Sequence, residues 1–149
     1  VGSLPGDRQG MTGGRVIIDG SVGALAGSRM RRGLLAIGGN AGDATGFELL
    51  AGTILVAGQP GPHTGLGMRR GSIVLLGTKS FCHEASTYIP PTFLQGGIWR
   101  PTFMALLGRH LVNTGFSAAR KTAWRDPWQQ WHGDSLAGCR GEILTPANA

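Results

Sequence analysis

Short apolar runs bounded by glycine recur at a fixed interval along the first half of the chain. Each run begins 19 residues after the previous one. Runs this short, with glycine on both sides, favour β-strands over helices. A fixed repeat of this length indicates a solenoid or an array of stacked units. The four runs are Val16-Ile17-Ile18, Leu35-Ala36-Ile37, Ile54-Leu55-Val56 and Ile73-Val74-Leu75.

Glycine and apolar columns follow the same 19-residue step. The columns are Gly14, Gly33, Gly52 and Gly71; Gly20, Gly39, Gly58 and Gly77; Gly23, Gly42 and Gly61; Gly27, Gly46 and Gly65; and the apolar Met11, Met30, Leu49 and Met68. Nineteen residues leave no room for a strand and a crossover helix, so each unit is expected to be a coil of short strands. Such coils stack about 4.8 Å apart. The sequence predicts an all-β fold, a right-handed parallel β-helix (solenoid) of 19-residue coils over residues 1–77.

Alternate side chains of each run face opposite sides of the strand. The first and third residues of the runs are expected to stack as inward ladders. The middle residues should point outward, yet all four are apolar, whereas a solvated face would carry polar residues. We therefore expect a cover over this face, either the chain's own C-terminal segment or another subunit. The candidate interface residues are Ile17, Ala36, Leu55 and Val74.

The period stops after Gly77, and residues 78–149 are predicted to form a helical and irregular cap. Pro101 suits the start of a helix near 101–114. A final strand is expected near 141–144, returning to the coil stack. The cap is expected to be anchored on the end of the solenoid by Trp124, Trp128 and Trp131, although Pro127 limits any helix containing all three.

Composition narrows the class of protein. Glycine makes up 27 of 149 residues, but only 15% of residues are charged and apolar runs separate the glycines, which argues against disorder. The net charge of +6 favours polyanions, namely nucleic acid, an anionic membrane, or an acidic cofactor or partner, and charge alone does not choose among them. Two cysteines, Cys82 and Cys139, are too few for a disulfide framework.

Without a signal peptide or a long apolar run, we expect a cytoplasmic protein that contacts no membrane. The chain starts at Val1 rather than Met, so it can be the C-terminal part of a longer protein.

No catalytic constellation is found in the sequence. The four histidines form neither an HxH nor an HExxH pattern, and no phosphate-binding GxxxxGK[ST] occurs. Cys82-His83-Glu84 gathers three metal-ligand types, but adjacent residues on a strand point apart. We therefore expect no catalytic residue, no metal and no cofactor bound for catalysis.

Arginine pairs recur at a spacing that fits the repeat. Arg31-Arg32 and Arg69-Arg70 are 38 residues apart, or two coils, which places them on one corner about 10 Å apart. Arg29 lies at the same turn, and Glu48 takes its position one coil later. From the residues alone, the corner is either solvated or paired with acidic residues of a neighbouring subunit. Nucleic acid is not expected, because no aromatic residues alternate with these arginines.

The motif Met11-Thr12-Gly13-Gly14-Arg15-Val16-Ile17-Ile18-Asp19-Gly20, repeated from Met30, Leu49 and Met68, resembles the GXGXG β-helix domain. That domain occurs in the glutamate synthase large subunit and in the β-helical subunit of formylmethanofuran dehydrogenases. The tail of this chain is similar to the latter and not to glutamate synthase. The chain most resembles the β-helical subunit of the bacterial formyltransferase/hydrolase complex, over roughly residues 6–144. The tail motifs are Pro91-Thr92-Phe93, Pro101-Thr102-Phe103-Met104-Ala105-Leu106-Leu107, Gly133-Asp134 and Gly141-Glu142-Ile143-Leu144.

This resemblance implies a non-catalytic structural subunit of an enzyme complex in one-carbon metabolism. Its expected partners are a formyltransferase subunit and a metal-dependent, amidohydrolase-like subunit that hydrolyses a formylated carrier. The resemblance also implies contact with a methanofuran-like carrier that bears a polyglutamate tail. The alternatives are a GXGXG linker domain of an amidotransferase or an unrelated self-assembling solenoid. The residues expected to hold the carrier tail are Arg29, Arg31, Arg32, Arg69 and Arg70.

Overall fold

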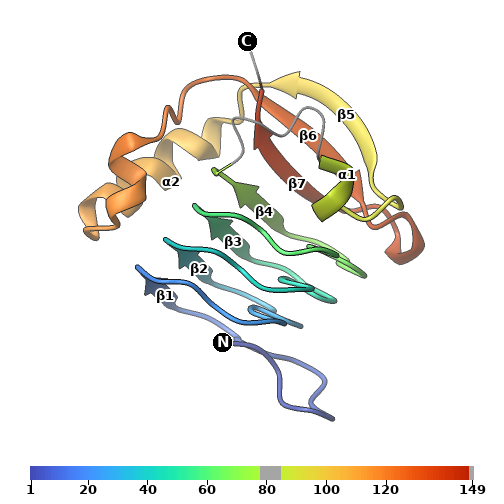
Figure 1. Ribbon diagram of the computed structural model, residues 1–149. Coiled ribbons are helices and arrows are strands. Elements are labelled where there is room, and N and C mark those ends of the chain that lie inside the picture. The colour runs from blue at the N-terminus through green and yellow to red at the C-terminus, as the bar shows by residue number, and fades with distance from the viewer. Residues whose placement is uncertain (78–84, 148–149) are drawn as a thin grey trace.

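The computed structural model describes residues 1–77 and 85–147. Its first half is a stack of parallel coils, each of which contributes one strand to a common sheet (Figure 1). The strands pair in register with a step of 19 residues, Val16 beside Leu35 and Leu35 beside Ile54. This confirms the predicted parallel solenoid and its coil length. The four strands are β1 (Arg15–Ile18), β2 (Leu34–Ile37), β3 (Thr53–Val56) and β4 (Ser72–Leu75).

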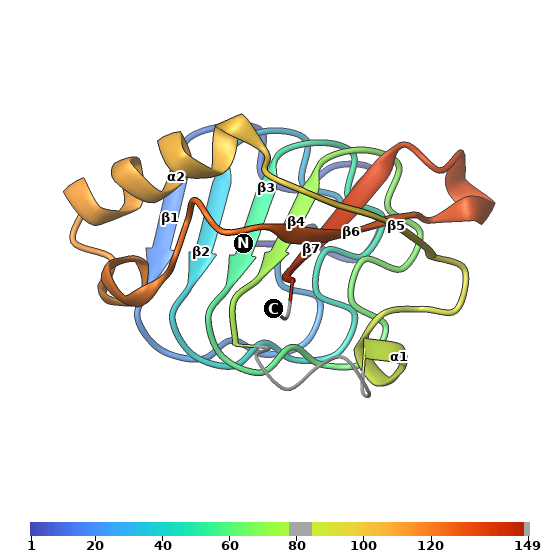
Figure 2. The ribbon, with the colours of Figure 1, turned by 90° about the horizontal axis from the view of Figure 1, so that it is seen from above.

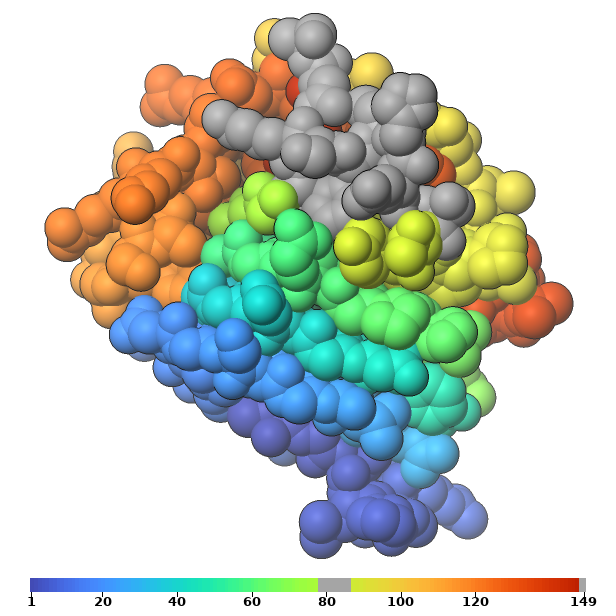
Figure 3. Space-filling view, in the orientation of Figure 1, coloured from blue at the N-terminus to red at the C-terminus, as the bar shows by residue number. Residues whose placement is uncertain are grey.

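The interior of the solenoid is built from the two inward ladders predicted by the alternation. Leu35, Ile54 and Ile73 are fully buried and belong to one apolar cluster. Met30 and Met68, from the apolar column of the repeat, are members of the same cluster. On β1 the equivalent side chains are only partly buried, because no further coil of the described chain covers β1. In the space-filling view the coils form successive bands below the C-terminal region (Figure 3).

Glycine is required where one coil turns into its strand. Gly52 and Gly71 have φ values of +102° and +98°, in the left-handed region that side chains disfavour. A Cβ at Gly71 would also lie 2.6 Å from the carbonyl oxygen of Gly52 in the coil below. Glycine in this column therefore allows both the left-handed backbone conformation and the close approach of the carbonyl group in the coil below.

The C-terminal region extends the same sheet. Strand order is β1-β2-β3-β4-β7-β6-β5, and β7 pairs parallel with β4 as though it were the next coil. β6 then pairs antiparallel with β7, and β5 pairs antiparallel with β6. The predicted final strand near 141–144 lies within β7, and the predicted helix near 101–114 corresponds to α2. The remaining elements are α1 (Ala85–Tyr88), β5 (Leu94–Trp99), α2 (Thr102–Asn113), η1 (Ser117–Lys121), β6 (Trp128–Gly133), η2 (Ser135–Ala137) and β7 (Gly141–Pro146).

The outer face of the solenoid sheet is covered by the chain's own C-terminal segment. α2 lies alongside this face (Figure 2), and an Arg15 Nη1–His110 Nε2 hydrogen bond of 2.6 Å joins β1 to α2. A second apolar cluster fills the space between them, made of Leu34, Ala36, Leu55, Val74, Met104, Leu111, Phe116, Ala119, Trp128 and Leu144. Of the two covers considered for this face, the structure has the intramolecular one.

The four candidate interface residues therefore differ in what they leave exposed. Ala36, Leu55 and Val74 have no exposed surface, because α2 and the segment that follows it lie over them. Ile17 is only partly buried at the open end of the sheet. Another subunit has no access to the first three residues in this fold. No helix among the described residues has the length and hydropathy needed to span a bilayer.

Replacing Leu55 by Ala should destabilise the fold strongly. The side chain is fully buried between the sheet and α2, so its loss leaves a cavity. We expect the free energy of unfolding to fall by about 2–5 kcal/mol, measured by urea denaturation. The matched control is Leu136→Ala, at a residue 85% exposed, with a change within about 0.5 kcal/mol. Equal effects of the two substitutions would contradict this packing.

Replacing Gly71 by Ala should cost more than replacing Gly13. The φ of Gly71 and the nearby Gly52 carbonyl both oppose a side chain, so we expect a loss of more than about 1 kcal/mol. A Cβ at Gly13 meets open space and needs no left-handed backbone. Gly13→Ala should leave the midpoint of thermal unfolding unchanged or slightly higher. A midpoint for Gly71→Ala equal to that of Gly13→Ala would disprove the role of this column.

Candidate functional site

The arginine pairs of the repeat lie at the same corner of the solenoid. The backbone amides of Arg31 and Arg32 both donate to the carbonyl of Met11. The amides of Arg69 and Arg70 donate in the same way to the carbonyl of Leu49, two coils later. All four side chains are exposed. We call Arg31, Arg32, Arg69 and Arg70 the basic corner.

The arginines of the basic corner form no ion pair with a described residue. Arg31 donates from Nη1 to Oε1 of Gln9 at 3.1 Å, a neutral acceptor. Within residues 1–77 and 85–147, the side chains of Arg32, Arg69 and Arg70 form no hydrogen bond or ion pair. In the coil between the two pairs, Leu50 and Ala51 take the equivalent positions and donate to the carbonyl of Met30. The corner therefore presents guanidinium groups that are available to an anionic ligand.

Arg29 differs from the other four predicted arginines. Its Nε donates to Oε2 of Glu48 at 2.6 Å, and its Nη1 donates to the carbonyl of Asp7. The pair forms because the two residues occupy equivalent positions in successive coils. Arg29 is half-buried, whereas the basic corner is exposed. It is thus engaged in holding the turn, and its charge is compensated within the chain.

A shallow hollow of about 480 Å³ lies beside Arg69. Its wall includes Asp134, which is 1% exposed and fully hydrogen-bonded. Oδ2 of Asp134 accepts from the amide of Gly67, and Oδ1 accepts from the amide of Leu136, both at 3.0 Å. These bonds fasten η2 to a solenoid turn. This corner hollow is lined by Glu48, Leu66, Gly67, Arg69, Asp134, Leu136 and Ala137.

The structural role of Asp134 was not found from the sequence. Gly133-Asp134 marks the tail motif, but nothing local predicts that this carboxylate is buried against a turn 67 residues away. The one available signal is chemical. Asp at the start of a short turn commonly accepts a hydrogen bond from an amide two or three residues later.

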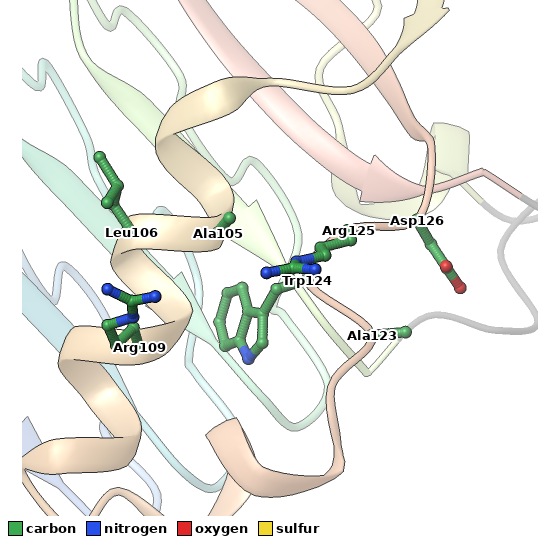
Figure 4. A pocket seen from close by; sticks show the side chains of 7 residues that line it. All are labelled: Ala105, Leu106, Arg109, Ala123, Trp124, Arg125 and Asp126. Atoms are coloured by element: carbon green, nitrogen blue, oxygen red, sulfur yellow. The ribbon is translucent and has the colours of Figure 1, made fainter.

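A second hollow, of about 440 Å³, opens between α2 and the segment that leads to β6 (Figure 4). One wall is a face of α2, and the other is the segment that leads to β6. The indole of Trp124 lies between the two walls. This α2 hollow is lined by Ala105, Leu106, Arg109, Ala123, Trp124, Arg125 and Asp126.

Metal-ligating residues are not gathered at one place in the described part of the chain. No three His, Cys, Asp or Glu residues there are placed to share a metal ion. Cys82-His83-Glu84 lies outside the described residues. The described histidine–carboxylate pair joins Nδ1 of His63 to Oδ1 of Asp43 at 2.9 Å on an exposed turn. The chemistry that these surfaces support is the binding of anions and apolar groups.

Comparison with known proteins gives a similarity to a solved structure. No protein-family model matches the chain, and no curated protein matches it. The structure is similar to a chain in the crystal structure of the formyltransferase/hydrolase complex (FhcABCD) from Methylorubrum extorquens in complex with methylofuran. The TM-score is 0.80 and the sequence identity 29%, over 99% of this chain and 51% of that chain. This chain thus spans about half the length of that relative. The resemblance to this complex that the glycine columns and tail predicted is confirmed.

Removing the Asp134 carboxylate should loosen the corner hollow. In Asp134→Ala the amides of Gly67 and Leu136 lose their buried acceptor, which costs about 1–3 kcal/mol. Hydrogen exchange at these two amides should accelerate. Asp19→Ala, at an exposed carboxylate with no side-chain bond in the described structure, is the matched control. Unchanged exchange at Gly67 would show that the loop is held by other contacts.

Proposed function

We propose that this chain is a non-catalytic structural subunit of a formyltransferase/hydrolase complex in one-carbon metabolism. In this role it joins a formyltransferase subunit to a metal-dependent, amidohydrolase-like subunit. The observation that carries the proposal is the similarity to a chain of FhcABCD over 99% of this chain, with a TM-score of 0.80. A match of that extent includes the cap as well as the coils.

The extent of the match bears on the alternative of a glutamate-synthase-type linker. The glycine repeat is common to both families, so the coils alone do not separate them. The tail motifs distinguish the β-helical subunit of the formylmethanofuran dehydrogenase type. They lie just before β5 (Leu94–Trp99), in α2 (Thr102–Asn113), in β7 (Gly141–Pro146) and around Asp134. Since these parts are matched together with the coils, the formyltransferase/hydrolase assignment is favoured.

The basic corner supports a more specific role toward the carrier. That relative was solved with methylofuran. In this chain Arg32, Arg69 and Arg70 are exposed and have no side-chain partner among the described residues. Guanidinium groups bind carboxylates through two parallel hydrogen bonds. We assign to the corner the binding of the polyglutamate tail of a methanofuran-like carrier, which would raise the carrier's effective concentration near the catalytic subunits.

Assembly provides the direct test of the structural role. The chain would be co-expressed with formyltransferase and hydrolase subunits encoded in the same genome, and the mixture resolved by size-exclusion chromatography with mass spectrometry. We expect one complex that contains all of them, and loss of association between the catalytic subunits when the chain is omitted. Elution of the chain alone, soluble and monodisperse, would overturn the proposal.

Charge reversal at the basic corner should discriminate between carriers by tail length. In the double variant Arg31→Glu/Arg69→Glu, binding of a long-tailed carrier to the complex should weaken roughly tenfold, because two exposed ion pairs become repulsive. A carrier with a single glutamate should bind nearly as before. Arg120→Glu, at an exposed arginine on η1, is the matched control. Equal losses for the long and short tails would rule out a tail-binding corner while leaving the structural role intact.

A further inference from the structure

The base of the α2 hollow is a rigid aromatic surface. Nε1 of Trp124 donates to the carbonyl of Ala119 at 2.8 Å, which fixes the orientation of the indole. Its ring stacks on Trp128 with centroids 6.5 Å apart and an angle of 29° between the planes. The ring also lies against Gly108, where any Cβ would collide with it. An aromatic group held in this way loses little conformational entropy when a ligand binds.

Two guanidinium groups stand beside this surface. Figure 4 shows Arg109, from α2, and Arg125, from the following segment, on either side of the indole. Both are exposed, and neither side chain has a hydrogen bond or ion pair within the described residues. The carboxylate of Asp126 points away from the indole (Figure 4). The hollow therefore joins an apolar surface to two uncompensated positive charges.

The surroundings of the hollow favour an anionic occupant. Residues 100–133 contain one acidic residue, Asp126, and five basic ones: Arg100, Arg109, Arg120, Lys121 and Arg125. Leu106, which lines the hollow, is 64% exposed, so apolar surface extends beyond the indole. The basic residues of the whole segment would attract an acidic partner, and an apolar side chain of that partner would fit the hollow.

We propose that the α2 hollow binds a segment of a partner protein that presents a carboxylate side chain beside an apolar one. The apolar side chain lies on Trp124 and Leu106, and the carboxylate bonds to Arg109 and Arg125. Sites for small molecules usually enclose most of the ligand, whereas this hollow is open along α2. Tryptophan and arginine are also the residues that contribute most to the affinity of protein interfaces. The inference concerns a surface made of other residues than the basic corner and does not depend on the proposed function.

The test uses the full chain and defined peptides. Spectra of ¹⁵N-labelled protein would be recorded with acetyl-Phe-Glu-Leu-amide and with the matched acetyl-Phe-Gln-Leu-amide. We expect the acidic peptide to shift the Trp124 indole N–H and the amides of 105–109, and to bind roughly fivefold more tightly than the amide form. In Arg109→Glu/Arg125→Glu this preference should disappear or reverse. Arg140→Glu, an exposed arginine outside the hollow, should retain the preference.

Three results would overturn the inference. The first is equal affinity for the two peptides. The second is retention of the preference in the double variant, whose fold would be checked by an unchanged thermal unfolding midpoint. The third is binding of hexanoate, titrated in parallel, as tightly as the acidic peptide or more tightly, which would make the hollow a small-molecule site. We expect hexanoate to bind more weakly.

Discussion

The direct stacking of each coil on the one before is the constraint on which the rest of this structure depends. Backbone hydrogen bonds join each coil to the next, at the turns as well as in the strands. The chain can sustain this only where no side chain separates the coils. At Gly58, for example, a Cβ would lie 2.5 Å from the backbone of Gly39 in the coil below. The glycine columns therefore fix the register, and the register fixes every other column, including the paired arginines.

The same register explains why both faces of the strands are apolar. Strands buried on both faces are expected to lack the alternation of polar and apolar residues found in half-exposed sheets. Here the inner face encloses the solenoid interior, and the outer face is covered by α2 and the segment after it. β7 continues the stack beyond β4, so the cap is part of the solenoid sheet. This arrangement leaves β1 and β5 as the two edges of the sheet in the described structure.

The 19-residue period is enough to predict most of the fold, whereas the remainder depends on contacts between residues far apart in the sequence. The inward ladders and their pairing follow from counting in steps of 19, because the pattern is local to each coil. The apolar middle residues of the four runs indicate only that something covers the outer face of the sheet. Which segment covers it depends on contacts such as those of Trp128 and Leu144, far along the chain from Leu55. The tryptophan spacing is similarly ambiguous: Trp128 and Trp131 both lie on β6, where Trp128 joins the outer cluster and Trp131 packs against the inner one. At the site, the arginine corner followed from the period, whereas the burial of Asp134 and the support of Trp124 by Gly108 did not.

The position of the two surfaces suits a subunit that holds others in place. The basic corner lies where the coils turn into β2 and β4, and the α2 hollow lies on the segment that covers the outer face of the same sheet. Both are attached to one continuous seven-stranded sheet. Ligands bound at the two surfaces would therefore keep a fixed separation and orientation, without the ordering cost of a flexible linker. In the proposed function, such a body acts on the geometry of its partners, because it holds bound groups at fixed positions relative to one another.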